Sequence, residues 1–216
     1  VHDLELSGYS GAEAQIASLA DDIAYSNHDT DDGLKTGLIS VGDMMENVDF
    51  FKRHYERVKR EYPSADHSRI VAETVRRMIN DMILDVADTS RANLESLQPQ
   101  SVEDIRACGK PVVSFSENMK SQMQSLKDFL FPNMYRHYKI NQMTSKGKRI
   151  VKDLFFLLFA ENNILPPKWQ EMARLCPSDA DGQRKKARLI ADFVAGLTDA
   201  SAIELHTRLF DPQMRI

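Results

Sequence analysis

The chain has 216 residues, enough for one large domain or two small ones with a sizeable core. Hydrophobic residues make up 42% and charged residues 28%, which excludes an intrinsically disordered chain. The nine glycines and eight prolines are too few for the many turns of a β-sandwich or barrel, and the net charge of −4 excludes a general attraction to nucleic acid.

Apolar residues that recur at steps of three and four predict helices along the first third of the chain. The first helix begins at Ala12. Residues 30–32, Thr-Asp-Asp, are typical of an N-cap and predict a second, short helix that ends near Gly37. Another helix follows and stops before Pro63, because the residue that precedes a proline disfavours helical geometry.

The longest periodic segment begins after Asp66, which can cap it, and extends to about Leu97. Residues 98–115 contain prolines and a glycine, so we expect mainly a connection there. Within this connection, the Pro-Val-Val-Ser-Phe stretch at 111–115 resembles a short strand. A new helix is predicted to start at Ser116.

The rest of the chain is also predicted to be helical. After an interruption at Pro132, a strongly apolar helix extends through Phe159, and the Pro166-Pro167 pair opens a short helix. The last two helices are expected at about 183–197 and 199–210. The sequence therefore predicts one all-α domain of about nine helices around a single shared core.

Two features bear on the cell compartment. No apolar run approaches the ~18 residues of a membrane span, since the best candidate, 150–160, contains Lys152 and Asp153. The two cysteines, Cys108 and Cys176, make neither a disulfide framework nor a zinc cluster. We therefore expect a cytoplasmic protein in a reducing compartment, with no membrane partner.

The segment with the most chemical content lies in the first predicted helix. Four polar residues fall within an arc of about 100° on such a helix: Asp21, Tyr25, His28 and Asp29. A carboxylate suits a hard divalent cation, and a tyrosine with a second carboxylate can stack on a sugar and hydrogen-bond to it. The face is either an ordinary solvated acidic surface or the wall of a polar cavity. The spacing alone favours the solvated surface, but the apolar residues around Asp21 count against it, because an uncompensated charge among them is costly.

The same segment resembles the dGTPase-like branch of the HD-domain phosphohydrolases. The resemblance begins with Ala20-Asp-Asp-Ile-Ala-Tyr25, followed by His28-Asp-x-Asp-Asp-Gly-Leu34. Four downstream strings continue it in the family's order: 113–119, 126–130, 134–137 and 192–199. The resemblance thus extends over nearly the whole chain.

The resemblance implies both a fold and an activity. Enzymes of this branch are all-α proteins that hydrolyse a deoxynucleoside triphosphate (dNTP) to the deoxynucleoside and inorganic triphosphate. Their divalent metal, Mg or Mn, is held by a distant His, a His-Asp doublet and a final Asp on a later helix. They are generally oligomers. By resemblance, we expect a dNTP substrate, a divalent metal cofactor and a homo-oligomer.

Site residues follow from the resemblance position by position. Asp21 matches the last metal ligand. Tyr25 and Asp29 match residues that pack on the deoxyribose and hydrogen-bond to its 3′-hydroxyl. Three downstream residues resemble the group on the phosphate and sugar side: Lys127, Tyr135 and His137. A lysine acts as a point charge on phosphate oxygens, although a surface lysine and a core tyrosine are the ordinary alternatives.

The chain departs from the family pattern in two places. Residues 198–202 read Thr-Asp-Ala-Ser-Ala, without the family's arginine and aromatic residue. Only twenty residues precede Asp21, and the one histidine among them is His2. His28-Asp29 spells the metal-binding doublet, but it follows the last ligand on the same helix, so we interpret it as a coincidence.

These departures, together with a first residue that is Val1 and not Met, predict an incomplete enzyme. We expect residues 1–216 to be one helical domain, the C-terminal half of a longer HD-domain enzyme. Residues 1–38 then carry the last part of the metal and nucleotide site. The catalytic residues are expected upstream of this chain, which alone is inactive.

Two other functions stay open on the sequence. The first is a helical interaction or regulatory module without chemistry, in which the apolar stripes at Met78/Met82 and Ile150/Phe155 form subunit interfaces. The second is another HD-domain phosphohydrolase that acts on monophosphates or signalling nucleotides. The Tyr25, Asp29 and Lys127 positions count against that one, because they suit a deoxynucleoside triphosphate.

Overall fold

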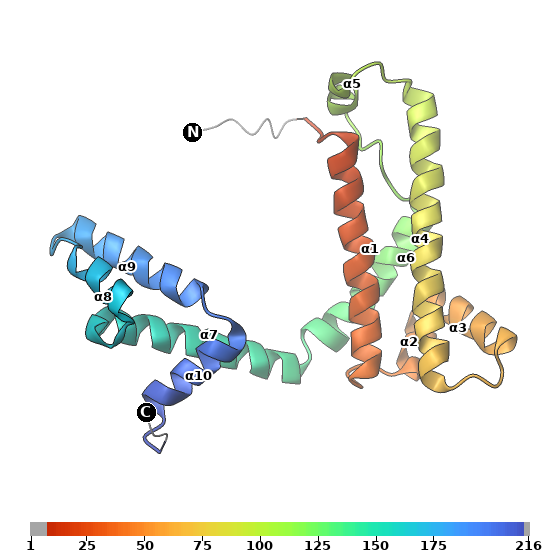
Figure 1. The fold of residues 1–216 in the computed structure, drawn as a ribbon. Coiled ribbons are helices and arrows are strands. Elements are labelled where there is room, and N and C mark those ends of the chain that lie inside the picture. Colours follow the sequence, from red (N-terminus) through yellow and green to blue (C-terminus); the bar gives the residue numbers. More distant parts are fainter. Residues whose placement is uncertain (1–7, 214–216) are drawn as a thin grey trace. The chain divides into compact units, whose positions relative to one another are not determined.

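A computed structural model describes residues 8–213 and shows an all-α fold (Figure 1). These residues contain ten α-helices and no strand, which confirms the predicted fold class. The chain divides into two units, Val1–His137 and Tyr138–Ile216. No helix among the described residues is long and apolar enough to cross a membrane.

The first unit contains six α-helices and a π-helical turn that follows the last of them. These elements are α1 (Ala12–Lys35), α2 (Val41–Asn47), α3 (Asp49–Glu61), α4 (His67–Leu97), α5 (Val102–Ala107), α6 (Glu117–Leu130) and η1 (Phe131–Tyr135). The predicted caps of two helices are confirmed. The Asp66 carboxylate accepts the Arg69 N–H at 2.9 Å and begins α4, and the Ser116 hydroxyl accepts the Met119 N–H at 3.2 Å and begins α6.

Helix α1 is longer than the sequence predicted. Thr30 does not cap a second helix, because its hydroxyl donates to the Ser26 carbonyl at 2.7 Å and its side chain is fully buried. A threonine whose hydroxyl is satisfied inside a helix has no need of a cap position, so α1 continues to Lys35. It ends before Gly37, which adopts the left-handed conformation with φ of 69°. The short helix predicted after Thr30 is therefore wrong.

The strand-like stretch predicted at 111–115 is also wrong. The backbone there runs past the N-terminal part of α1 without a strand partner. The Gln15 side-chain oxygen accepts the N–H groups of Val112 and Val113, at 2.9 and 3.0 Å, and its amide donates to the Ser10 carbonyl at 2.7 Å. One buried glutamine therefore satisfies backbone groups that a strand would pair with a neighbouring strand.

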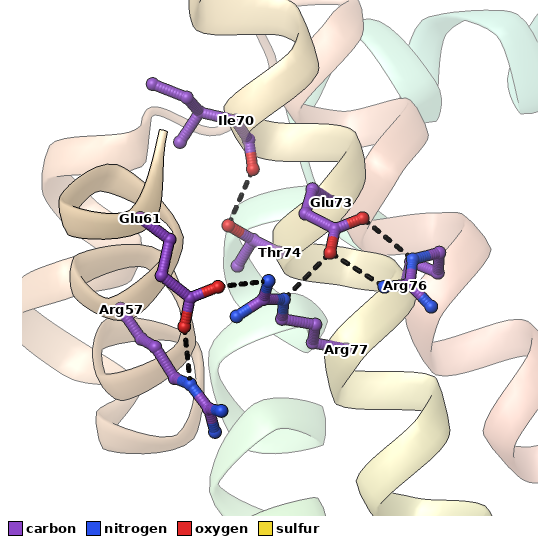
Figure 2. Close-up of polar contacts among 7 residues, drawn as sticks. All are labelled: Arg57, Glu61, Ile70, Glu73, Thr74, Arg76 and Arg77. Atoms are coloured by element: carbon purple, nitrogen blue, oxygen red, sulfur yellow. Dashed lines mark hydrogen bonds and ion pairs between the residues drawn. The ribbon is translucent and has the colours of Figure 1, made fainter. Parts of the chain in front are cut away.

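Ion pairs join α3 to α4 in the first unit (Figure 2). Arg77 donates to Glu73 at 2.8 Å on its own helix and to Glu61 on α3 at 2.6 Å. The hydrogen bonds from Arg77 and Arg57 lower the pKa of Glu61 to about 2, and those from Arg76 and Arg77 lower the pKa of Glu73 to about 2. Both carboxylates are therefore charged at neutral pH. The Glu61–Arg77 pair joins α3 to α4, and Glu73 holds the Arg77 guanidinium from the same helix.

The second unit contains the remaining helices of the described chain. They are α7 (Tyr138–Ala160), the 3-10 turn η2 (Asn162–Ile164), α8 (Pro167–Arg174), α9 (Ala180–Ala195) and α10 (Asp199–Phe210). Its core gathers around Leu154, Leu158 and Ile190, whereas the first unit has a core of its own. Buried apolar residues of the described chain therefore form two clusters, and the predicted single shared core is wrong.

Two of the apolar residues predicted at a subunit interface lie inside the first unit. Met78 and Met82 on α4 are completely buried in its core. A side chain with no exposed surface cannot bind a partner without unfolding of its surroundings, so this part of the interface prediction is wrong. The assignment of residues 1–216 to one domain stays a prediction.

Candidate functional site

The polar arc predicted on the first helix lies on α1, which is unbroken along its whole length (Figure 1). Asp21 and His28 are exposed, and Tyr25 keeps 63% of its surface accessible. Asp29 is half-buried, because it lies nearer the side of α1 that faces α6 and η1. The arc is therefore largely open to solvent. Within the described chain, Asp29 is bonded on the side of α1 that faces α6 and η1.

A hydrogen bond joins Asp29 to Tyr135. The Tyr135 hydroxyl, on η1, donates to the Asp29 carboxylate on α1, although the two residues are 106 positions apart. Burial, the hydrogen bond to Asp29 and the charge of that carboxylate all raise the pKa of Tyr135. The phenol therefore stays protonated at neutral pH and acts as a donor.

The π-helical turn carries Tyr135 to α1. Pro132 has no N–H to continue the hydrogen bonding of α6, and the chain widens there into η1. At the end of this turn, the Arg136 N–H donates to the Phe131 carbonyl at 3.0 Å. Gly33 allows a close approach of this turn to α1. A Cβ there would lie 2.9 Å from the Ile39 side chain and 3.4 Å from the Met134 sulfur.

A second contact joins α1 to α6. The Lys127 ammonium lies 3.2 Å from the Asp22 carboxylate, and both side chains are about half exposed. Sequence reasoning did not assign Asp22, although it is the second Asp of the Ala-Asp-Asp string. It lies seven residues before Asp29 on α1, roughly 10 Å along the helix. His137 is half-buried and follows Tyr135 by two residues, with its backbone N–H on the Met134 carbonyl at 3.0 Å.

A groove of about 600 Å³ with a mixed polar and apolar lining includes the Lys127–Asp22 pair. It is formed by α1, α6 and the segment before α6, and its lining includes Ser18 and Gln124. Three lysines contribute to this lining: Lys110, Lys120 and Lys127. The lining also holds two carboxylates, Asp22 beside Lys127 and Glu117 beside Lys120, so the lysines exceed the acidic groups by one. This small positive excess is compatible with an anionic ligand, and the groove is large enough for a phosphate chain.

The described residues do not hold a divalent metal on their own. Among residues 8–213, no three His, Cys, Asp or Glu side chains lie close enough together to bind an ion. Asp21 offers a single exposed carboxylate, whereas Mg²⁺ and Ca²⁺ sites use several oxygen ligands. His2 lies outside the described residues. Any metal that Asp21 binds therefore needs ligands from outside this described part of the chain.

Comparison with known proteins supports the resemblance seen in the sequence. The deoxyguanosinetriphosphate triphosphohydrolase-like protein of Parvibaculum lavamentivorans is 46% identical over 209 residues, which cover 97% of this chain and 51% of that protein. Its counterpart in Bordetella pertussis is 43% identical over 199 residues, covering 92% and 49%. The chain is a relative of the dGTPase-like proteins. It spans about half the length of the relatives it matches.

A second match concerns the later part of this chain. Residues 113–208 match the phosphohydrolase-associated domain. The match includes Lys127, Tyr135 and His137, and it extends into α10. Near its end, the Thr198 hydroxyl accepts the Ser201 N–H at 3.2 Å and caps α10. Thr198 belongs to the family-like string 192–199, so part of that string has a structural role.

Proposed function

We propose that this chain is part of a dNTP triphosphohydrolase, which converts a deoxynucleoside triphosphate to the deoxynucleoside and inorganic triphosphate. The observation that carries the proposal is the hydrogen bond between Tyr135 and Asp29. In the family resemblance, Asp29 matches a sugar-side position and Tyr135 belongs to the group on the phosphate and sugar side, and the two residues are hydrogen-bonded although they are far apart in the sequence. The name of the relatives, deoxyguanosinetriphosphate triphosphohydrolase-like protein, supports the substrate class.

The proposed binding mode follows the α6 side of α1. Tyr25 packs against the deoxyribose, and the Asp29–Tyr135 pair hydrogen-bonds to its 3′-hydroxyl. Lys127, together with His137, then contacts the phosphates, and the ion pair with Asp22 orients the lysine. The spacing of roughly 10 Å between Asp22 and Asp29 along α1 suits a ligand whose sugar and phosphates are both held.

Asp21 is proposed as one ligand of a divalent ion, Mg or Mn. Since the described residues do not complete a metal site, we propose that the remaining ligands come from other residues of the assembled enzyme. This chain alone is then inactive. By the same resemblance, the assembled enzyme is proposed to be a homo-oligomer.

Activity measured on two proteins tests this function. The first is the chain itself, and the second is a fusion protein in which this chain replaces the matched 209 residues of the Parvibaculum relative. Each is incubated with dGTP and Mn²⁺, and inorganic triphosphate is measured by ion chromatography. We expect release by the fusion protein and none by the chain. Release by the chain would contradict its proposed incompleteness.

A matched pair of variants tests the sugar site in the fusion protein. Tyr135→Phe removes the hydroxyl that bonds to Asp29, whereas Tyr9→Phe removes a hydroxyl from a tyrosine of nearly equal exposure, 40% against 41%. We expect the first variant to lower kcat/KM for dGTP about tenfold, as the loss of one hydrogen bond to a charged partner does. Equal activity in both variants would contradict the role of Tyr135.

The second candidate function is a helical interaction or regulatory module, and a largely apolar groove between α1 and α4 favours it. The melting temperature of the fusion protein with and without dGTP and Mn²⁺ separates the two candidates, because only a protein that binds the ligand is stabilised by it. A rise supports the nucleotide enzyme. No change would favour the module. A rise with dGMP that equals the rise with dGTP would favour a phosphohydrolase for monophosphates.

A further inference from the structure

Helices α1 and α4 lie side by side in the first unit (Figure 1). A groove of about 800 Å³ runs between them. Its lining is mostly apolar and includes Ile16 and Ala20 from α1, and Ile83 and Val86 from α4. Two of these large side chains are half exposed, Ile16 at 52% and Ile83 at 53%. Apolar surface of this extent on a folded unit marks a place where another molecule or segment binds.

The groove lies next to the polar arc of α1. Ala20 and Ala24 line the groove, and each directly precedes a residue of the arc, Asp21 and Tyr25. His28 belongs to both the groove lining and the arc. Because alanine side chains are short, a backbone that enters the groove can approach α1 closely there. Asp21 is turned about 100° from Ala20 and does not line the groove, but it shares a face of α1 with His28, which does, so a segment in the groove borders the face that carries Asp21.

We propose that this groove binds an apolar helix from the half of the dGTPase-like relatives that this chain does not match. The relatives are about twice as long as their matched region, so a segment of suitable size exists in them. From Ile16 to His28 the groove follows α1 for roughly 18 Å, the length of about three helical turns. The inference rests on the proposed function, which needs further metal ligands beside Asp21.

The charges of the groove also favour a helix. Its apolar floor is flanked at one end by Arg91 and Glu95 on α4 and at the other by His28 on α1. An amphipathic helix places an apolar stripe on such a floor and its polar flanks against charged rims, as in other helix-in-groove complexes. One docked helix then explains both open features of α1, since it covers the apolar side chains and brings new side chains to Asp21.

Cysteine labelling at two adjacent positions tests the proposal. Ile83 and Leu84 are both 53% exposed on α4, but only Ile83 is among the residues that line the groove. Ile83→Cys and Leu84→Cys are each made in the chain and in the fusion protein, and the rate of maleimide labelling is measured by mass spectrometry of the peptide. Val58→Cys, a small change in volume at a fully buried position of the same core, reports by its protection that the first unit of each protein is folded.

We expect the labelling rate at position 83 to fall at least tenfold from the chain to the fusion protein, and the rate at position 84 to change less than twofold. Equal rates at position 83 in the two folded proteins would overturn the proposal. So would protection at position 83 that develops in the chain alone as its concentration rises, because the occupant would then be a second copy.

The same two proteins separate this inference from the proposed function. Protection at position 83 in a fusion protein that releases no triphosphate from dGTP would support the docked helix and count against the nucleotide enzyme. Triphosphate release without protection at position 83 would support the enzyme and overturn the docked helix. The readouts differ because labelling measures access to the groove, whereas release requires the complete catalytic site.

Discussion

The two sides of α1 differ in how far this chain supplies their partners. On the α6 side, three residues of α1 have partners within the chain. Gln15 bonds to the segment before α6, Asp22 pairs with Lys127, and Asp29 accepts a hydrogen bond from Tyr135. On the α4 side, the apolar residues near the N-terminal part of the helix border an open groove, and Ile16 keeps 52% of its surface exposed. The α6 side is thus covered by polar contacts within the chain. The α4 side also packs on its neighbour, for example through Ile23 and Asn27, but it keeps apolar surface that the described residues do not bury.

The largest effect is expected at Gln15, on the closed side. Gln15→Leu leaves the Val112 and Val113 N–H groups without their acceptor, and each buried unpaired group costs about 1–3 kcal/mol. We therefore expect the free energy of unfolding of the first unit to fall by about 3 kcal/mol in urea titrations. Gln142→Leu, at an exposed glutamine on α7, is the control and should change little. Equal midpoints for the two variants would contradict the bridging role of Gln15.

A smaller effect is expected at Tyr135, where the closed side reaches the site. Tyr135→Phe removes the hydrogen bond to Asp29, and because Tyr135 is 41% exposed we expect a loss of about 1 kcal/mol in the free energy of unfolding. The exposure-matched Tyr9→Phe should cost less. The measurement is urea unfolding of the chain at pH 7, and equal costs for both variants would show that the hydrogen bond adds no stability.

The same pair of proteins has a defined pH dependence. An unfolded tyrosine loses its proton near pH 10, whereas burial and Asp29 raise the pKa of Tyr135 in the folded protein. The stability that the wild type gains over Tyr135→Phe is therefore fully present below about pH 10 and is lost as the pH rises through the higher folded pKa. Unfolding measured from pH 7 to pH 11 checks this sign, and a growing wild-type advantage at high pH would contradict it.

The ion pair between Lys127 and Asp22 should contribute still less to stability. Both side chains are about half exposed, and ion pairs of this kind contribute roughly 0.2–1 kcal/mol, less at high salt. In a double-mutant cycle with Lys127→Met and Asp22→Asn, we expect a coupling free energy below about 1 kcal/mol. In the fusion protein, Lys127→Met should nevertheless weaken dGTP binding about tenfold, because a phosphate contact to an ammonium group is worth more. Unchanged binding would remove Lys127 from the site.

Local signals in the sequence predict much of this fold. Asp66 and Ser116 cap the helices expected from them, and the final helix has the predicted bounds, 199–210. The failures come from tertiary contacts. Thr30 has the residue type of a cap but lies buried inside α1, and the stretch at 111–115 has strand-like residues but bonds to Gln15. Neither contact is visible in local sequence, since each depends on the packing of distant segments.

The candidate site shows the same limit. Helical spacing alone groups Asp21, Tyr25 and Asp29 on one face of α1, and no structure is needed for that. The meeting of Asp29 with Tyr135 depends on the π-helical turn at Pro132, whose geometry no sequence period predicts. The family resemblance predicted that Asp29 and Tyr135 belong to the site, but it did not predict the hydrogen bond between them. It also assigned no role to Asp22.

The smallest effect is expected at Ile16, the neighbour of Gln15 on the open side of α1. Ile16 is already half exposed, and isoleucine and serine have similar helix propensities, so Ile16→Ser should change the free energy of unfolding of the chain by less than about 0.5 kcal/mol. If a helix covers the groove in the fusion protein, the same substitution should cost about 1–2 kcal/mol there, because an isoleucine then loses a buried environment. The difference between the two proteins, measured by urea unfolding, reports the burial that Ile16 gains in the fusion protein. Equal losses of stability in the chain and in the fusion protein would mean that the groove side of α1 stays exposed in both. Of the two sides of α1, only the side that carries Gln15 would then depend on packing partners.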